Sequence, residues 1–191
     1  MSMSWQTPAA EPQPGPAGLV YADLPNRIIA YVIDIVILVV VGIVVGIVLG
    51  VVGLSTVNLD LRSGSFGQIN YLAIVISGLI GLAVSAGYFI YTWTKMRATV
   101  GMRVLGMQIG NEVDGATLTQ NQAIKRWIYM GGWISVAQIV NPIPLLGLLV
   151  SVAGLVYVIY LLYTTSQSPT KQGYHDHMAK TMVVKATRSV G

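Results

Sequence analysis

The chain has 191 residues, of which 54% are hydrophobic and 9% are charged, and its formal net charge is +4. This composition is typical of a small integral membrane protein, so the expected partner is the lipid bilayer. It argues against a nucleic-acid-binding protein, because the positive-inside rule accounts for basic loops more simply. With no cysteine and two histidines, thiolate and three-histidine metal sites are excluded, and we expect no metal and no cofactor.

The first 22 residues are rich in proline and alanine and lack the basic start and apolar core of a signal peptide, so they are predicted to be a flexible cytoplasmic tail. We expect a membrane domain over residues 23–186 and a short C-terminal tail over residues 187–191. In this domain the apolar run 27–52 is long enough to span a hydrocarbon core of about 30 Å. It carries one acid, Asp34, which is costly at that depth and marks a candidate functional site.

Arg27, Tyr31 and Asp34 share one face of this first helix, at 100° per residue. Seven residues separate the Cα atoms of Arg27 and Asp34 by about 10 Å, which is too far for an easy direct pair. We therefore expect Asp34 to meet another helix, a water or the cytosolic segment.

A second helix is predicted over residues 69–94, after a loop of turn formers at residues 53–68. Both helices carry small residues at every fourth position, a spacing that permits close approach of two helix backbones. These small residues are Gly42, Gly46 and Gly50 in the first helix and Ala73, Ser77, Gly81 and Ser85 in the second. We expect the two ridges to pack against each other. Tyr88, Tyr91 and Trp93 are typical of an aromatic belt at the membrane interface.

Residues 95–126 form a basic loop that is predicted to be cytoplasmic. Alternation over residues 103–109, the turn sequence NEVDG and a short run at residues 116–119 predict a small β-hairpin between the second and third helices. Thr119 and Gln122 form a capping-box pattern that begins the next helix. The closing sequence TMVV at residues 181–184 has strand character and could add to the hairpin, which would bring Asp176 to the membrane face.

Residues 127–163 carry no charge, and one helix of this length would be about 55 Å long, nearly twice the core thickness. The Asn-Pro-Ile-Pro sequence at residues 141–144 predicts a break. The halves 127–140 and 145–163 form either two spans, or a re-entrant arm and one span. Because the C-terminal tail is basic, we favour an all-α bundle of four transmembrane helices in the cell membrane, with both termini cytoplasmic and the small cytosolic hairpin as a cap.

Three segments in the same order give the chain a family resemblance. ADLPNRIIAYVID (residues 22–34), RATVGMRVLGMQI (97–109) and YHDHMAKTMVV (174–184) resemble the RDD family of bacterial membrane proteins. The resemblance implies that the family's arginine and two aspartates are Arg27, Asp34 and Asp176. Met102 departs from the family's usual lysine and Lys180 from its usual glycine. Sodium/proton antiport is attributed to some members.

Two functions from different classes stay open. In one, the protein exchanges a monovalent cation for protons, with Asp34 as carrier, Arg27 and Asp176 setting its charge state, and Tyr31, Arg103 and His175 in support. In the other, it is a non-catalytic accessory or scaffold subunit, in which Arg27, Asp34 and Asp176 form a structural polar network and the glycine ridges bind another membrane protein. Asp34 would then be a structural acid bonded to Arg27, Arg103 or a backbone group. Either protein is expected to form a homo-oligomer or to bind a partner membrane protein.

Enzyme and metal functions are disfavoured by the distribution of reactive residues. No nucleophile stands beside a base in any recognisable pattern, so we expect no catalytic residues and no enzyme. The His-Asp-His sequence at residues 175–177 has no other histidine or cysteine to complete a metal site. Hydrogen-bonded structural residues are the favoured interpretation of that sequence.

Overall fold

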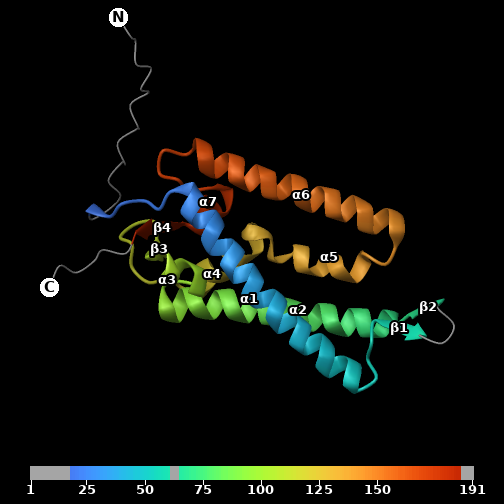
Figure 1. The fold of residues 1–191 in the computed structure, drawn as a ribbon. Helices are drawn as coiled ribbons and strands as arrows, with labels where there is room; N and C mark the ends of the chain where they lie inside the picture. Colours follow the sequence, from blue (N-terminus) through green and yellow to red (C-terminus); the bar gives the residue numbers. More distant parts are fainter. Residues whose placement is uncertain (1–17, 61–64, 186–191) are drawn as a thin grey trace, which may run out of the picture.

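The computed structural model describes residues 18–60 and 65–185, which fold into a helical bundle with small elements at both ends (Figure 1). Residues 1–17 of the expected N-terminal tail and residues 187–191 lie outside the described part. The bundle consists of α1 (Leu24–Val51), α2 (Tyr71–Tyr91), a broken segment formed by α4 (Gln120–Trp127) and α5 (Ile134–Val140), and α6 (Pro144–Gln167). The predominantly helical fold expected from the sequence is therefore confirmed.

Helix α1 confirms the predicted first helix and carries apolar side chains around its whole circumference. Pro25 is tolerated in its first turn, because the first N–H groups of a helix have no partner within the helix. Only Ala30 and Asp34 are buried in α1, and most of its valines and isoleucines are exposed. Exposed apolar side chains along a helix of 28 residues are those of a lipid-facing span.

Three helices are long and apolar enough to cross a membrane: Leu24–Val51, Tyr71–Met96 and Leu145–Gln167. The second of these consists of α2 and a π-helical turn at Thr92–Met96. It ends at Arg97, which has a left-handed φ of 56°. The expected count of four spans thus reduces to three candidate spans among the described helices.

The segment between α2 and α6 is interrupted, because α4 and α5 are separated by a π-helical turn at Ile128–Gly132 and a kink at Gly131 (φ 112°). A Cβ at Gly132 would overlap the ring of Trp127. The predicted break after residue 140 is confirmed, since α5 ends at Val140 and α6 begins at Pro144. The predicted Thr119–Gln122 capping box begins α4 as expected.

A small cap covers one end of the bundle, formed by α3 (Val100–Val104), β3 (Met107–Asn111), α7 (Tyr174–Ala179) and β4 (Thr181–Lys185). Strands β3 and β4 pair antiparallel, with Met107 opposite Lys185 and Asn111 opposite Thr181. Upstream of α1, Tyr21 bridges to Val184, and Ala22 N–H donates to the Val183 carbonyl at 2.9 Å. The cap thus joins three segments that are distant in sequence.

The predicted β-hairpin of residues 103–109 and 116–119 is wrong. Residues 100–104 are helical, because Thr99 caps α3 by accepting a hydrogen bond from Met102 N–H at 3.2 Å. The NEVDG turn does form, and Asn111 N–H donates to the Ala116 carbonyl at 2.9 Å. The partner of β3 is β4, which confirms that the closing sequence forms a strand and joins the β-structure of the basic loop. The Met182, Val183 and Val184 side chains of β4 are all buried in the cap.

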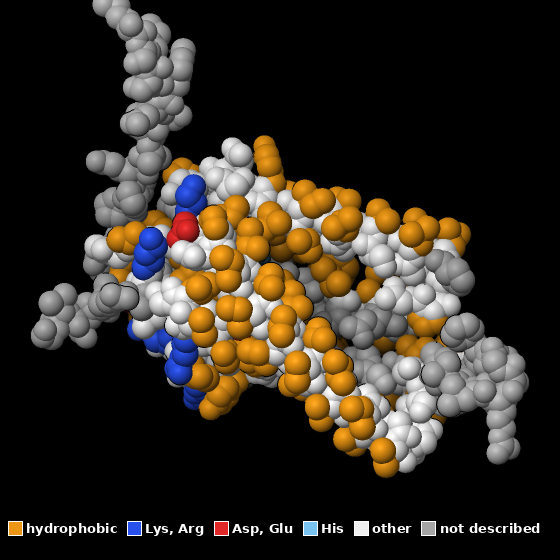
Figure 2. Space-filling model, in the orientation of Figure 1, with side chains coloured by type: hydrophobic (Ala, Val, Ile, Leu, Met, Phe, Trp, Pro, Cys, Tyr) orange, Lys and Arg blue, Asp and Glu red, His pale blue; other side chains and the backbone are white. Residues whose placement is uncertain are grey.

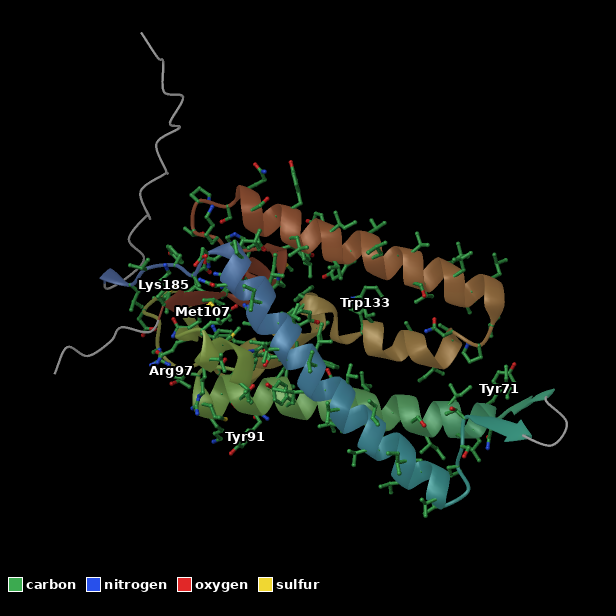
Figure 3. The ribbon with its side chains drawn as sticks, in the orientation of Figure 1. Tyr71, Tyr91, Arg97, Met107, Trp133 and Lys185 are labelled. Carbon is green, nitrogen blue, oxygen red and sulfur yellow. The ribbon has the colours of Figure 1, made fainter. Side chains whose placement is uncertain are left out.

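The other end of the bundle carries a hairpin where the sequence predicts a loop. Strands β1 (Val57–Asp60) and β2 (Ser65–Ile69) form a two-stranded antiparallel sheet. Tyr71 lies at this end, whereas Arg97, Met107 and Lys185 lie at the cap end (Figure 3). Asn58 and Asp60 alternate with Val57 and Leu59, which is the two-residue period of a short strand.

The expected packing between the small-residue ridges of α1 and α2 is wrong. A Cβ added at Gly42, Gly46 or Gly81 would meet no atom within 4 Å. On α2 the close approach is instead to α5, where a Cβ at Gly78 would lie 2.7 Å from Ile139 Cγ1. Helix α5 packs against α2 at this position, and Gly42 and Gly46 of α1 are left without a close neighbour among the described residues.

Candidate functional site

Asp176 is the centre of a buried charge cluster in the cap. Its side chain is 0% exposed and accepts a hydrogen bond from Arg27 Nη1 at 2.9 Å and another from Arg126 Nη1. Asp176 also caps the first turn of α7, since Oδ2 accepts from Gly173 N–H at 3.0 Å. The carboxylate thus has charge-assisted partners on α1 and α4 and a backbone partner in its own turn.

The two arginines extend this cluster in different directions. Arg27 donates from Nε to the Ala22 carbonyl and from Nη2 to the Val183 carbonyl, both at 3.1 Å. Arg126 donates from Nη1 to Thr181 Oγ1 at 2.6 Å, and its guanidinium lies 5.3 Å from the centroid of the buried Trp93 ring. Together they fasten the cap to α1, to α4 and to the end of the α2 span.

The electrostatics of the cap keep Asp176 ionised and His175 neutral. Burial alone would raise the pKa of Asp176, but the positive charges of Arg126 and Arg27 outweigh it and hold the pKa far below its usual range. Burial lowers the pKa of the neighbouring His175 to about 4, against the attraction of Asp176. At neutral pH the cluster therefore contains two cations and one anion.

Folding stability is expected to decrease between pH 6.5 and pH 4 because His175 is buried in its neutral form. The unfolded chain takes up a proton at about pH 6.5, whereas the folded chain takes it up only near pH 4. Between pH 7 and pH 4 this difference lowers the free energy of unfolding of the wild type by about 3 kcal/mol, and His175→Gln should not show this decrease. The measurement is the Tm of each protein in micelles at pH 7 and pH 4. His177→Gln is the matched control, since that side chain is 53% exposed. Equal pH dependence in wild type and His175→Gln would contradict this assignment.

Asp34 occupies a separate pocket between α1, α2 and α3. It is 1% exposed, and both of its carboxylate oxygens accept hydrogen bonds. Tyr88 Oη donates to Oδ1 at 2.7 Å, Gly101 N–H donates to Oδ1 at 2.8 Å, and Thr99 Oγ1 donates to Oδ2 at 2.6 Å. Asp34 thus meets another helix and the segment after it, as expected.

The Asp34 pocket depends on a close contact between α1 and the start of α3. A Cβ at Gly101 would overlap the Ala30 carbonyl, so only glycine lets the two backbones approach this closely. This approach brings the Gly101 N–H to the carboxylate one turn further along α1. The sequence TVGM at residues 99–102 therefore supplies a cap, a contact and a donor in one short segment.

Of the three residues predicted to support the site, His175 lies beside Asp176, whereas Tyr31 and Arg103 contact neither Asp34 nor Asp176 through a hydrogen bond among the described residues. Tyr31 stacks on Phe89 with ring centroids 6.2 Å apart, and it is 40% exposed. Arg103 does not reach Asp34, because its Nη2 donates to the Met96 carbonyl at 3.4 Å on an exposed face. His175 Nε2 lies 3.5 Å from Asp176 Oδ2. Arg27 and Asp176 are brought together, while Asp34 is held apart from both.

Sequence reasoning missed Arg126, Trp93, Tyr88 and Thr99 as parts of these sites. Trp93 was predicted to belong to an aromatic belt and Arg126 to the basic loop, yet both are buried. The sequence offered one signal for Thr99. It is a threonine directly before the apolar sequence Val-Gly-Met, and this is a typical position for a helix N-cap.

The two centres offer donors rather than metal ligands. Among the residues that the structure describes, no group of three or more His, Cys, Asp or Glu side chains could hold a metal ion. The partners of Asp34 are two hydroxyl groups and a backbone N–H, all of which donate to it. Such an arrangement stabilises a fixed carboxylate in an apolar setting.

Comparisons with known proteins give one match. The model of the RDD family matches residues 21–180, a range that includes the first two segments of the resemblance, residues 174–180 of the third, and Arg27, Asp34 and Asp176. No curated protein and no solved structure matches the chain.

Proposed function

This chain belongs to the RDD family, and from that premise we propose that it is a non-catalytic accessory or scaffold subunit of a complex in the cell membrane. Its family and its three long apolar helices make it a membrane protein. The observation that carries the proposal is the Asp34 pocket. Three donors at 2.6–2.8 Å hold both oxygens, which is the environment of a structural acid rather than of a carrier that must bind and release an ion.

A second feature supports a docking role. The exposed glycines of α1 face a cleft of about 510 Å³ between α1, α2 and the kink at Gly131. Its walls include Gly42, Gly46 and Gly81, where a Cβ would meet nothing. In a membrane, glycines spaced by four residues let a second helix approach closely. The partner proposed for this cleft is a transmembrane helix of another subunit.

We further propose four spans, with both termini and the cap in the cytoplasm. The segment from α4 to α5 runs antiparallel to α2 and lies beside it, and so would be a short, kinked third span (Figure 1). Lysine and arginine side chains gather at the cap end, and the sides of the helices are apolar (Figure 2). This distribution supports a cytoplasmic cap under the positive-inside rule.

Cation/proton exchange is the alternative, and one observation favours it. Asp34 is the sole acid of α1, and intramembrane acids are frequently ion or proton sites. In that case Tyr88 and Thr99 would have to release the carboxylate in each cycle. The two functions are separable by experiment, because an exchanger acts without a partner and an accessory subunit does not.

The scaffold proposal is tested on the cleft of α1. In membranes of the native host, we expect the wild-type chain of 20.4 kDa to migrate in a larger assembly that contains a second membrane protein. Gly42→Leu combined with Gly46→Leu should release the chain from this assembly, because a Cβ at either position meets no atom of the chain and the leucine side chains would extend into the cleft. The measurement is native gel electrophoresis followed by mass spectrometry of the assembly.

The control is Gly87→Leu, at an exposed glycine of α2 that lies outside the cleft lining and also has no atom within 4 Å of its Cβ. It should leave the assembly intact. An assembly of this chain alone would contradict the accessory role and favour a homo-oligomer. A pH change in liposomes of purified wild type on addition of sodium, lithium or potassium would favour the exchanger.

A further inference from the structure

A second cavity, of about 210 Å³, lies at the cap end of the helices between α1 and α6. Its lining side chains near the outside are apolar and exposed, which places its opening on the side of the molecule that faces lipid. They include Ile28 and Val32 of α1 and Val158 and Leu162 of α6. The cavity therefore opens sideways into the hydrocarbon region.

Most of the cavity surface is apolar, and the few polar side chains of its inner wall include three with a buried nitrogen atom that lacks a partner. Trp93, Arg126 and His175 all line the cavity. Trp93 Nε1, Arg126 Nε and His175 Nδ1 are each buried without a hydrogen-bond partner among the described residues. Trp93 Nε1 and Arg126 Nε carry N–H groups, and because buried N–H groups are nearly always paired, these two point to a missing acceptor.

The charges on this wall favour an anionic acceptor. Arg27 and Arg126 both line the cavity, and between them they share the single carboxylate of Asp176. Asp34 also lines the cavity, but each of its oxygens already accepts a hydrogen bond from a hydroxyl or a backbone N–H. The polar side chains of the inner wall thus present cationic and N–H donors, with no unengaged carboxylate beside them.

We propose that this cavity binds one anionic phospholipid from the leaflet on the cap side, with its phosphate against Arg126 and Trp93 and an acyl chain between α1 and α6. The volume is that of about seven water molecules, so it takes a phosphate and the first part of a chain, while the rest of the lipid stays in the bilayer. A soluble anion would match the donors but not the exposed apolar mouth. This inference goes beyond the scaffold role and does not depend on it.

The test is lipid binding by the full-length, delipidated protein in detergent, measured by native mass spectrometry. Phosphatidylglycerol and phosphatidylcholine with the same acyl chains are titrated separately. We expect one phosphatidylglycerol to bind about tenfold more tightly than phosphatidylcholine, the ratio that one additional charge-assisted hydrogen bond provides. Equal binding of the two lipids would overturn the proposal.

Val158→Trp and its control Val156→Trp locate the site. Both residues are exposed on α6, so both variants should fold, but only Val158 lines the cavity. Val158→Trp should abolish the preference for phosphatidylglycerol, and Leu162→Trp at the same mouth should do likewise. Val156→Trp should retain the preference. An undiminished preference in Val158→Trp and Leu162→Trp would place the lipid elsewhere and overturn the proposal.

Glycerol 3-phosphate distinguishes the lipid from a soluble anion with the same head-group chemistry. At equal concentration it should not displace phosphatidylglycerol from the wild-type protein, because it lacks the chain that occupies the apolar mouth. Displacement by glycerol 3-phosphate would identify a site for a soluble phosphate compound and overturn the lipid assignment.

Discussion

Asp176→Asn is expected to lower the free energy of unfolding by about 4 kcal/mol, which is the largest effect of any single substitution proposed for this protein. Removing one partner of a buried ion pair costs about 3–5 kcal/mol, because the remaining charge stays buried without its counter-ion. Here two arginines are left, with side chains 10% and 2% exposed. The cap should separate from α1 and α4. The measurement is the Tm in micelles, which should decrease by about 10 °C or more.

The control for this variant is Asp23→Asn. Asp23 is 46% exposed and lies 3.9 Å from Lys185, so this pair contributes little in water. Its amide oxygen can still accept the hydrogen bond from Asn26, and the Tm should change by no more than about 1 °C. Equal Tm values for Asp176→Asn and wild type would show that the cluster does not hold the cap in place.

Asp34→Asn is expected to lower the free energy of unfolding by about 3 kcal/mol. We expect no cation-dependent proton flux in either the wild type or this variant. Both carboxylate oxygens of Asp34 accept hydrogen bonds, and in asparagine one of these oxygens is replaced by an NH2 group that cannot accept. At least one buried donor would therefore lose its partner. Unfolding by a titration with SDS measures the first effect. A pH-sensitive dye in liposomes, with sodium, lithium or potassium added, measures the second.

Tyr88→Phe separates the structural role of the pocket from transport. It removes one of the three donors to Asp34 and should cost about 1 kcal/mol, a third of the effect of Asp34→Asn. Flux in wild type that disappears in a well-folded Asp34→Asn protein would identify Asp34 as a carrier. That outcome would replace the accessory role with the exchanger.

Local sequence patterns were sufficient where one segment determines its own structure. The apolar run of α1, the Asn-Pro-Ile-Pro break before α6 and the capping box of α4 were all predicted correctly. In each case the determining interaction lies within a few residues: burial in lipid, a missing N–H or a side chain bonded to the next turn. The resemblance also selected Arg27, Asp34 and Asp176 from only seven acids and eleven bases.

Partner choice between distant segments was not predictable in the same way. Strand β3 had two potential partners, the nearby residues 116–119 and the distant β4, and it pairs with β4. The α2 ridge had the glycines of α1 as an apparent partner, but the close contact of α2 is made to α5 by Gly78, which lies outside the ridge. These outcomes depend on how well whole surfaces fit, and residue spacing on one segment does not contain that information.

The sequence by itself therefore determined that this is a membrane protein of the RDD family, and which of its charges are anomalous. Only the tertiary structure decided what those charges do. Asp176 is paired with Arg27 and with Arg126, which the sequence alone would place in a basic loop. Asp34 is bonded to Tyr88, Thr99 and Gly101 instead of an arginine. The physical reason is that a buried charge is stabilised by whichever donors the folded chain brings within about 3 Å, and those donors come from residues up to 149 positions apart in the chain.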